Sequence, residues 1–283
     1  NAGEIGGDVL LDSNPQAITS GDDTYHGLGD GSVDGRVIGL LGDDTMVGSA
    51  ANDTFEGGAD DDRLIGRAGD DVIDGGDGSD LIGGGAGDDE VTAGDCDDDV
   101  FGGFGDDALF GQRGDDEINA GAGDDTVAGN NQDDTIRGNA GADSLDGGSG
   151  QDTILGGRGN DTVVGGSSGD VLGGGTGNDE MIGGGGDDTI HGGAGNDEIT
   201  TGDGADDIVI RKGMGQDLVT DFTDGQDQVD VRALNLQNFG DLQSKYTVTA
   251  HQNAVFFDFG DGDTLMLDGV TLPQLAYGDF VWF

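Results

Sequence analysis

An aspartate recurs every nine residues from Asp44 to Asp206, and this spacing constrains the fold more than any other feature of the chain. Two residues after each aspartate stands an apolar side chain, from Met46 to Ile208. Self-similarity at a fixed short period is typical of repeat architectures, in which each unit packs only on its neighbours. The aspartates in phase are Asp44, Asp53, Asp62, Asp71, Asp80, Asp89, Asp98, Asp107, Asp116, Asp125, Asp134, Asp143, Asp152, Asp161, Asp170, Asp179, Asp188, Asp197 and Asp206.

The repeated unit reads Gly-Gly-x-Gly-x-Asp-x-U-x, in which U is a large apolar residue, and residues 147–155 and 192–200 are clean copies. Its glycine-rich part can adopt positive φ values that residues with a Cβ resist, so the backbone can curl until several carbonyl oxygens converge. Ca²⁺ takes about six to eight oxygen ligands, which such carbonyls and one carboxylate from each of two stacked loops can supply. We therefore expect these aspartates to be calcium ligands. The last three residues of each unit predict a short strand.

Two units, with two turns and two strands, predict a closed coil of eighteen residues, in which Asp44 stacks on Asp62 and Asp53 on Asp71. Successive coils then pair as parallel strands, and the U side chains of both sheets meet inside. The loops form two stacks, so about 17 calcium ions fit if each gap between coils holds one. Without metal the stacked carboxylates repel one another, and we expect the metal-free chain to be unfolded.

The chain carries 60 acidic against 10 basic side chains, a formal charge of −50. Nucleic acid and anionic membrane surfaces would be repelled by it, so we expect cations as partners. No apolar run is long enough to predict a membrane span. The first residues, Asn1 to Glu4, lack an initiator Met, and we interpret the chain as the C-terminal part of a longer protein or as a processed product. For the lone Cys96, an incidental free thiol and intermolecular pairing both stay open.

These repeats resemble the RTX family, the hemolysin-type calcium-binding repeats of secreted bacterial proteins. The resemblance covers Asp44 to Asp206 in phase, with an earlier copy at residues 21–25. It implies an all-β fold, a right-handed parallel β-roll solenoid with a C-terminal β-rich cap. We expect residues 39–210 to form the roll and residues 1–38 an irregular N-terminal cap, because Asp23 and Asp44 are 21 residues apart. Residues 211–283 are then the capping and secretion-signal segment.

The fourth position of the unit departs from glycine at five places. A residue with a Cβ strains a loop that needs positive φ, so we expect weaker calcium sites there. These residues are Ala51, Asp60, Cys96, Gln132 and Ser168.

After Asp206 the phase is lost, and Asp217 follows eleven residues later. Alternating runs at 246–249, 254–259 and 264–267 predict strands. The final residues, 279–283, are an acid followed by four large apolar residues. This terminus resembles the signal that the ABC transporter of type I secretion reads, and it is equally compatible with the last strand of a cap. The resemblance implies a secreted, extracellular protein, with an association with the cell surface left open.

An enzyme active site is not evident. Residues 165–169 match the nucleophile elbow Gly-x-Ser-x-Gly, but they lie in phase with the glycine loops and lack the strand-turn-helix context. His26, His191 and His251 are far apart, without a zinc-binding spacing. We therefore expect no catalytic residues and no enzyme. The sequence favours a calcium-binding module that folds after type I secretion, attached to an N-terminal effector outside this chain. The alternative is a surface-layer, adhesin or extracellular-matrix component built from the same roll.

Overall fold

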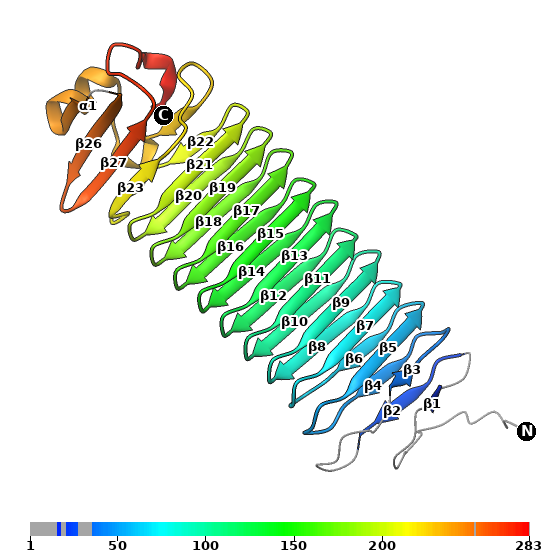
Figure 1. The fold of residues 1–283 in the computed structure, drawn as a ribbon. Coiled ribbons are helices and arrows are strands. Elements are labelled where there is room, and N and C mark those ends of the chain that lie inside the picture. The colour runs from blue at the N-terminus through cyan, green and yellow to red at the C-terminus, as the bar shows by residue number, and fades with distance from the viewer. Residues whose placement is uncertain (1–15, 18–20, 28–35, 252, 283) are drawn as a thin grey trace, which may run out of the picture. The chain divides into compact units, whose positions relative to one another are not determined.

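The computed structural model describes residues 16–17, 21–27, 36–251 and 253–282. The chain forms two compact units, residues 1–140 and residues 141–283. Each unit is a β-solenoid of parallel strands, in which the chain alternates between two sheets (Figure 1). Most of the predicted N-terminal cap, residues 1–38, lies outside the described residues, and the predicted domain boundaries stay predictions.

In the first unit the odd-numbered strands form one sheet and the even-numbered strands the other, each in chain order. The strands are β1 (Gln16–Ala17), β2 (Thr24–His26), β3 (Val37–Ile38), β4 (Thr45–Val47), β5 (Thr54–Ala59), β6 (Arg63–Ile65), β7 (Val72–Asp77), β8 (Leu81–Ala86), β9 (Glu90–Asp95), β10 (Asp99–Phe104), β11 (Ala108–Arg113), β12 (Glu117–Ala122), β13 (Thr126–Asn131) and β14 (Thr135–Ala140).

The pairing register confirms the predicted coil of eighteen residues. Strand β10 pairs in parallel with both β8 and β12, and Val100 lies opposite Ile82 and Ile118. Strand β4 pairs with β6, with Met46 opposite Leu64. Each strand therefore pairs with the strand two nonapeptide repeats further along the chain, as a coil of two repeats requires.

Many strands are longer than the three residues that the sequence predicts. Strand β5, for example, runs for six residues and includes the first three residues of the next nonapeptide repeat. Gly58, at φ +120°, still pairs with Gly76 in the next coil. The backbones of successive coils follow the same path, so the ladder of hydrogen bonds between them continues into the turn. The pattern of side chains alone does not reveal this.

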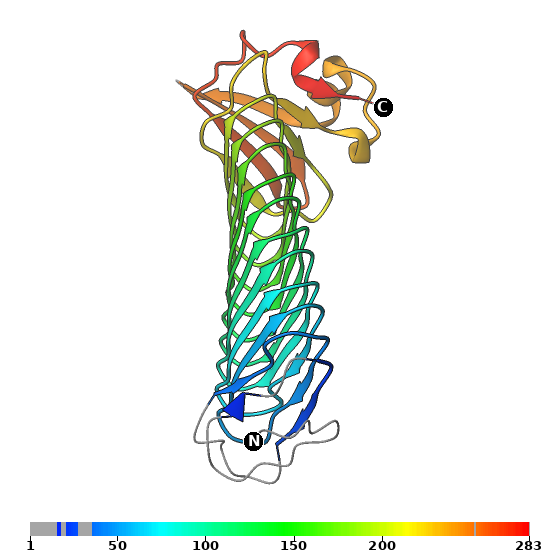
Figure 2. The same cartoon turned by 90° about the vertical axis from the view of Figure 1, so that its right-hand side faces the viewer.

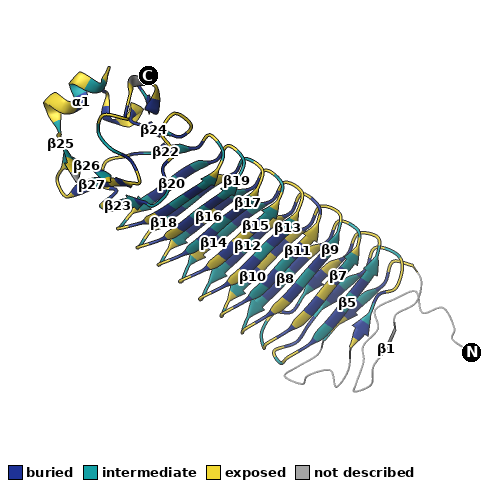
Figure 3. Cartoon of the chain, turned by 45° about the horizontal axis from the view of Figure 1, so that its top comes forward, coloured by how far each residue is buried: buried dark blue, intermediate teal, exposed yellow. Residues whose placement is uncertain are grey.

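The core of each unit consists of the U side chains. Every apolar residue two positions after a repeat aspartate, from Met46 to Ile208, is at most 1% exposed. Along the strands of the repeats from β5 to β21, buried residues alternate with more exposed ones at the start of each strand (Figure 3). This alternation fits strands whose one face covers the interior of the coil, as predicted.

In the second unit one sheet has the order β15-β17-β19-β21-β23-β27-β26-β25, and the other β16-β18-β20-β22-β24-β28. Its elements are β15 (Ser144–Ser149), β16 (Thr153–Arg158), β17 (Thr162–Ser167), β18 (Val171–Thr176), β19 (Glu180–Gly185), β20 (Thr189–Ala194), β21 (Glu198–Asp203), β22 (Asp207–Val209), β23 (Gln216–Val219), β24 (Gln228–Asp230), η1 (Arg232–Leu234), α1 (Phe239–Lys245), β25 (Thr247–His251), β26 (Ala254–Gly260), β27 (Asp263–Asp268), η2 (Tyr277–Asp279) and β28 (Phe280–Val281).

The end of the second unit departs from the repeat. Strands β25, β26 and β27 are antiparallel and confirm the three predicted strands, whereas the short helix α1 was not predicted. Figure 2 shows these elements in orange and red, next to the yellow-green coils of the same unit. Strand β28 pairs in parallel with β24, so Phe280 and Val281 form the last strand of the cap. Within the described residues, no helix is long and apolar enough to cross a membrane.

Aromatic side chains fill the cap. The ring of Phe280 lies 5.9 Å from that of Phe257 and 5.3 Å from that of Trp282, measured between centroids. Phe257 is fully buried, and Phe280 and Trp282 are each 5% exposed. The cap thus has an apolar core of its own, unlike the glycine-rich coils, whose core is one side chain per turn.

Candidate metal centres

Each predicted calcium ligand lies at the start of a strand, where a glycine loop ends. All of these aspartates, from Asp44 to Asp206, are between 0 and 3% exposed. The pairing of strands eighteen residues apart brings them into stacks within each unit, as the sequence predicted. A buried column of carboxylates is costly unless charge or hydrogen bonds compensate it.

One oxygen of each stacked carboxylate is compensated by the backbone. The Oδ1 atom of Asp62 accepts a hydrogen bond of 2.7 Å from the backbone N–H of Asp44 in the preceding coil. The N–H of Asp62 in turn donates to Asp80 Oδ1, also at 2.7 Å. The same ladder runs through the second unit, where the N–H of Asp161 donates to Asp179 Oδ1 at 2.9 Å.

The second oxygen has no such compensation. In thirteen of these aspartates Oδ2 is buried without a hydrogen-bond partner: Asp44, Asp62, Asp71, Asp80, Asp89, Asp98, Asp107, Asp116, Asp161, Asp179, Asp188, Asp197 and Asp206. In Asp53 the corresponding atom is Oδ1, because the N–H and the hydroxyl of Ser49 donate to its Oδ2. A buried oxygen that bears charge and lacks a donor requires a cation or a proton.

Backbone carbonyls border the same space. A Cβ built on Gly57 would lie under 3.0 Å from both Asp62 Oδ2 and the carbonyl oxygen of Gly75 in the next coil. The arrangement repeats in the second unit, where a Cβ on Gly174 would meet Asp179 Oδ2 and the carbonyl oxygen of Gly192. Carboxylate and carbonyl oxygens converge here in a small space, and this donor set suits a hard cation such as Ca²⁺.

Burial controls the acidity of the stacked carboxylates. Burial raises the pKa of Asp62 to about 7, although the N–H of Asp44 opposes the shift, and the neighbouring carboxylates of Asp80 and Asp44 raise it further. The same causes raise the pKa of Asp98 to about 8. The metal-free fold therefore favours protonated aspartates, whereas a bound cation would favour the ionised form.

The loops need left-handed backbone at the second and fourth positions. Four of the five residues that replace the fourth glycine adopt positive φ, between 77° and 92°: Asp60, Cys96, Gln132 and Ser168. Ala51 is not among the residues with positive φ, and its N–H is bonded to the hydroxyl of Ser49. The expected strain therefore holds at four of these positions, and the weaker calcium sites stay a prediction.

A second ladder, on the exposed side, consists of the residues immediately before the repeat aspartates. Asp88 Oδ1 accepts a 2.9 Å hydrogen bond from the N–H of Asp106, and Asp70 Oδ1 accepts one of 3.1 Å from the N–H of Asp88. Here the acceptor belongs to the earlier coil, so this ladder runs opposite to the buried one. Each coil is tied to both neighbours by side-chain bonds as well as by strand pairing.

The described residues contain no cluster of three or more His, Cys, Asp or Glu side chains that could bind a metal alone.

Sequence reasoning missed five further buried aspartates in the second unit, which are 1 to 8% exposed: Asp217, Asp227, Asp230, Asp263 and Asp279. The N–H of Asp197 donates to Asp217 Oδ1 at 3.1 Å, and the N–H of Asp206 to Asp227 Oδ1 at 3.3 Å. Asp217, Asp227, Asp263 and Asp279 each lie one or two residues after a glycine and one or two residues before a buried apolar residue, a signal that the broken spacing concealed.

Comparison with known proteins agrees with this geometry. The family model of the RTX calcium-binding nonapeptide repeat matches residues 38–73, 56–91, 74–109, 101–136, 128–163, 137–172 and 173–208. No curated protein matches the sequence.

Two solved structures are among those to which the chain is similar. The R3 subunit of a mannuronan C5-epimerase from Azotobacter vinelandii is 22% identical, with a TM-score of 0.30, over 54% of this chain and 79% of that one. The extracellular lipase LipA from Serratia marcescens is 17% identical, with a TM-score of 0.31, over 86% of this chain and 40% of the lipase.

Proposed function

Since the chain belongs to the family of RTX calcium-binding nonapeptide repeats, we propose that calcium ions bind between its successive coils, with the nineteen repeat aspartates as ligands. Bound calcium would supply positive charge and accept oxygen donors at each gap. The proposal includes up to about 17 ions, one for each gap that the sequence predicts along the two stacks.

The buried Oδ2 atoms carry this proposal. Taken together they are a series of ionisable oxygens removed from water without a donor, for example at Asp62, Asp89 and Asp179. A divalent cation in each gap compensates two carboxylates at once, which hydrogen bonds from a glycine-rich backbone cannot do. The protein's own contribution is to hold the carboxylate by its Oδ1 atom, so that Oδ2 faces the carbonyls of the loop.

The same geometry couples folding to calcium. Each coil buries few apolar side chains and stacks negative charge, so the folded state depends on an ion that binds it and not the unfolded chain. Extracellular calcium modules bind with dissociation constants of about 10⁻⁴ to 10⁻³ M. The chain would stay unfolded where calcium is scarce, pass through a type I ABC exporter that reads its C-terminus, and fold outside the cell. An effector domain preceding this chain would be exported with it.

A calcium titration tests the central claim. Far-ultraviolet circular dichroism of the chelated protein should show little β-structure, and millimolar Ca²⁺ should induce it cooperatively. Mg²⁺ is the control ion, since it demands a tight octahedral shell and retains its waters. Full β-structure in chelator, or equal induction by Mg²⁺, would contradict the proposal. Export is tested separately, by comparing secretion of the chain with and without residues 279–283 in a host that has a type I exporter.

A structural role is the second candidate. Phe101 and Phe104 on the outer side of β10 are 45% and 70% exposed. Neighbouring exposed aromatic residues favour contact with another protein surface. Calcium-dependent light scattering of the folded protein would support assembly into a surface layer or matrix, and Phe104→Ser should then reduce it. A strictly monomeric calcium-loaded protein would argue for the folding module alone.

A further inference from the structure

The stack of aspartates through Asp197 continues beyond the last nonapeptide in phase. The next member is Asp217, twenty residues later instead of eighteen. Residues 212–220 read Lys-Gly-Met-Gly-Gln-Asp-Leu-Val-Thr, which is a repeat unit with lysine at its first position. The two additional residues precede this unit, and they explain why the nine-residue spacing does not find it.

The structure treats residues 212–220 as a further turn of the roll. Gly213 and Gly215, at its second and fourth positions, have φ of +82° and +89°. Val219, at the apolar position, is fully buried and lies opposite Ile199. The exposed ladder also continues, because the N–H of Gln216 donates to the side chain of Asn196 at 3.0 Å.

An unpartnered oxygen lies in the gap before this turn. Asp197 is 2% exposed, its Oδ2 has no hydrogen-bond partner, and this atom lies beside Gly192. In most earlier coils the corresponding Oδ2 atom borders the carbonyl oxygen of the following coil, as Asp62 Oδ2 borders that of Gly75. At Gly192, as at Gly84 beside Asp89, the three atoms nearest to an added Cβ all belong to the aspartate. For Asp197 the following coil is the turn that contains Asp217.

The four buried aspartates beyond Asp217 differ in one respect, since both of their oxygens are hydrogen-bonded to the protein; for Asp230 the donors belong to Arg232. Asp227 accepts from the N–H groups of Asp206 at 3.3 Å and Thr223 at 2.7 Å. Asp263 accepts from the N–H of Gly213 at 2.8 Å and from that of Gly215 at 3.2 Å. Asp279 accepts from the N–H groups of Gly225 and Ala276. These carboxylates are satisfied without a cation.

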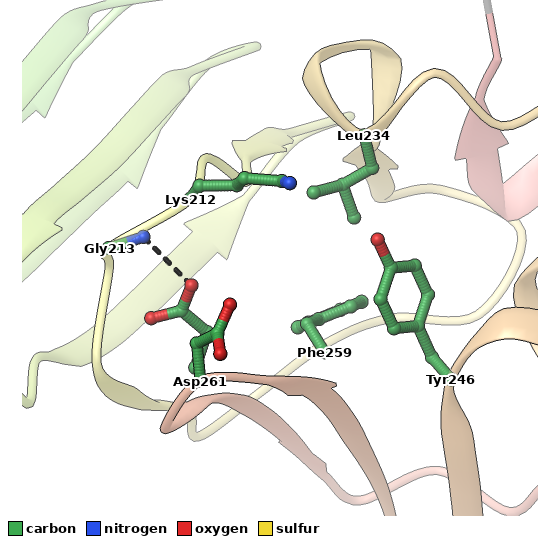
Figure 4. A pocket seen from close by; sticks show the side chains of 7 residues that line it. Lys212, Gly213, Leu234, Tyr246, Phe259 and Asp261 are labelled. Carbon is green, nitrogen blue, oxygen red and sulfur yellow. Dashed lines mark hydrogen bonds between the residues drawn. The ribbon is translucent and has the colours of Figure 1, made fainter.

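The lysine at the first position lines a cavity with Leu234, Tyr246 and Phe259, and its side chain extends toward Leu234 and Tyr246 (Figure 4). Asp263 and the exposed Asp261 line the same cavity, which has a volume of about 140 Å³, whereas Asp217 is not among its lining residues. The lysine side chain is thus directed to the cap, and it does not take the place of an ion in the stack.

We propose that the gap between Asp197 and Asp217 is one further calcium site, outside the repeats in phase, and that the stack ends there. This inference rests on the proposed function, because it extends the same kind of gap by one coil. Asp217 would be a metal ligand, and the satisfied carboxylates of Asp227, Asp263 and Asp279 would close the two stacks without metal.

Native mass spectrometry of the full chain at saturating calcium counts the bound ions. We expect Asp217→Asn to hold one ion fewer than the unmodified protein. Asp224→Asn is the matched control, because it removes the same charge from an exposed position in the same segment, and it should lose none. An equal ion count in both variants would overturn the inference.

A crystal of the unmodified, calcium-loaded protein provides a second measurement that does not depend on folding of the variant. Anomalous difference density is expected between Asp197 and Asp217, and its absence while the repeat gaps contain density would overturn the inference. Absence of ions from the repeat gaps themselves would instead contradict the proposed function, so the two failures are distinguishable.

Discussion

The adjacent residues Asp88 and Asp89 allow the calcium proposal to be tested with a matched pair of substitutions. Asp89 is 2% exposed and its Oδ2 has no hydrogen-bond partner, whereas Asp88 is exposed. Asp89→Asn retains an oxygen that can accept the hydrogen bond from the N–H of Asp71, which is 2.8 Å long. It removes the negative charge that faces the carbonyls. Asp88→Asn removes the same charge from the exposed ladder.

The expected magnitude follows from the position of Asp89 between two gaps. An ion at a free concentration of about 100 times its dissociation constant stabilises the folded state by about 2.7 kcal/mol. Loss of one ion would lower the free energy of unfolding by about that amount, and loss of the ions on both sides by about 5 kcal/mol. An exposed substitution such as Asp88→Asn should change it by no more than about 0.5 kcal/mol.

Urea unfolding at fixed free calcium, followed by far-ultraviolet circular dichroism, measures both values. Asp89→Asn should also raise the calcium concentration at the folding midpoint, while Asp88→Asn leaves it nearly unchanged. Equal losses for the two variants would refute the reasoning, since they would show that net charge and not the buried oxygen determines the dependence on calcium.

Three other predictions concern pH, packing and the cap. In chelator, β-structure should increase as the pH is lowered through the raised pKa values, about 8 for Asp98 and about 7 for Asp62. A raised folded-state pKa gives stability that is complete below the unfolded value of 3.8 and is lost as the pH rises; circular dichroism that does not change with pH would contradict this. Ile118→Ala, at a fully buried core position, should lower the free energy of unfolding in calcium by about 2 to 5 kcal/mol. The control Val72→Ala, at a 45% exposed position, should cost about 0.5 kcal/mol or less by the same urea assay. Truncation after Asp206 removes β22 and β23, which pair with β20 and β21, together with the rest of the cap, and should leave the repeats largely disordered at millimolar calcium. Deletion of residues 1–38 should leave calcium-induced β-structure mostly intact, and an unchanged calcium midpoint in the truncated chain would show that the cap is dispensable.

The stacking of the repeat aspartates could be predicted from the sequence because the period is strict. Once two units close one coil, the position of Asp62 on Asp44 and of Leu64 beside Met46 follows from counting. The sequence could not predict which of the two carboxylate oxygens accepts the hydrogen bond from the backbone N–H. That depends on the direction in which the N–H of one aspartate points toward the next coil, which is a property of the three-dimensional course of the loop.

The cap was less predictable because no period applies to it. Its strands show the alternation of apolar residues, but the helix α1 is only seven residues long and has no recognisable apolar face. Asp227 and Asp279 were missed because their stacking depends on loops of unequal length. Their hydrogen bonds come from groups far apart in the sequence, such as Gly225 and Asp279, 54 residues away.

The two opposed ladders of hydrogen bonds have a consequence for how such a chain can change in length. In the buried ladder each coil donates a hydrogen bond to the next coil, and in the exposed ladder it accepts one from that same coil. Because every coil offers the same donors and acceptors, any coil can follow any other. Insertions or deletions of whole units leave every bond type in place, whereas the loss of a single residue within a strand would turn its apolar side chains outward and break both ladders. The two extra residues before residues 212–220 lie ahead of β23 and not within it, so the strand keeps its register and they are accommodated. Where the turns keep their regular length, chains of this kind should therefore vary in length in discrete steps of one nonapeptide repeat.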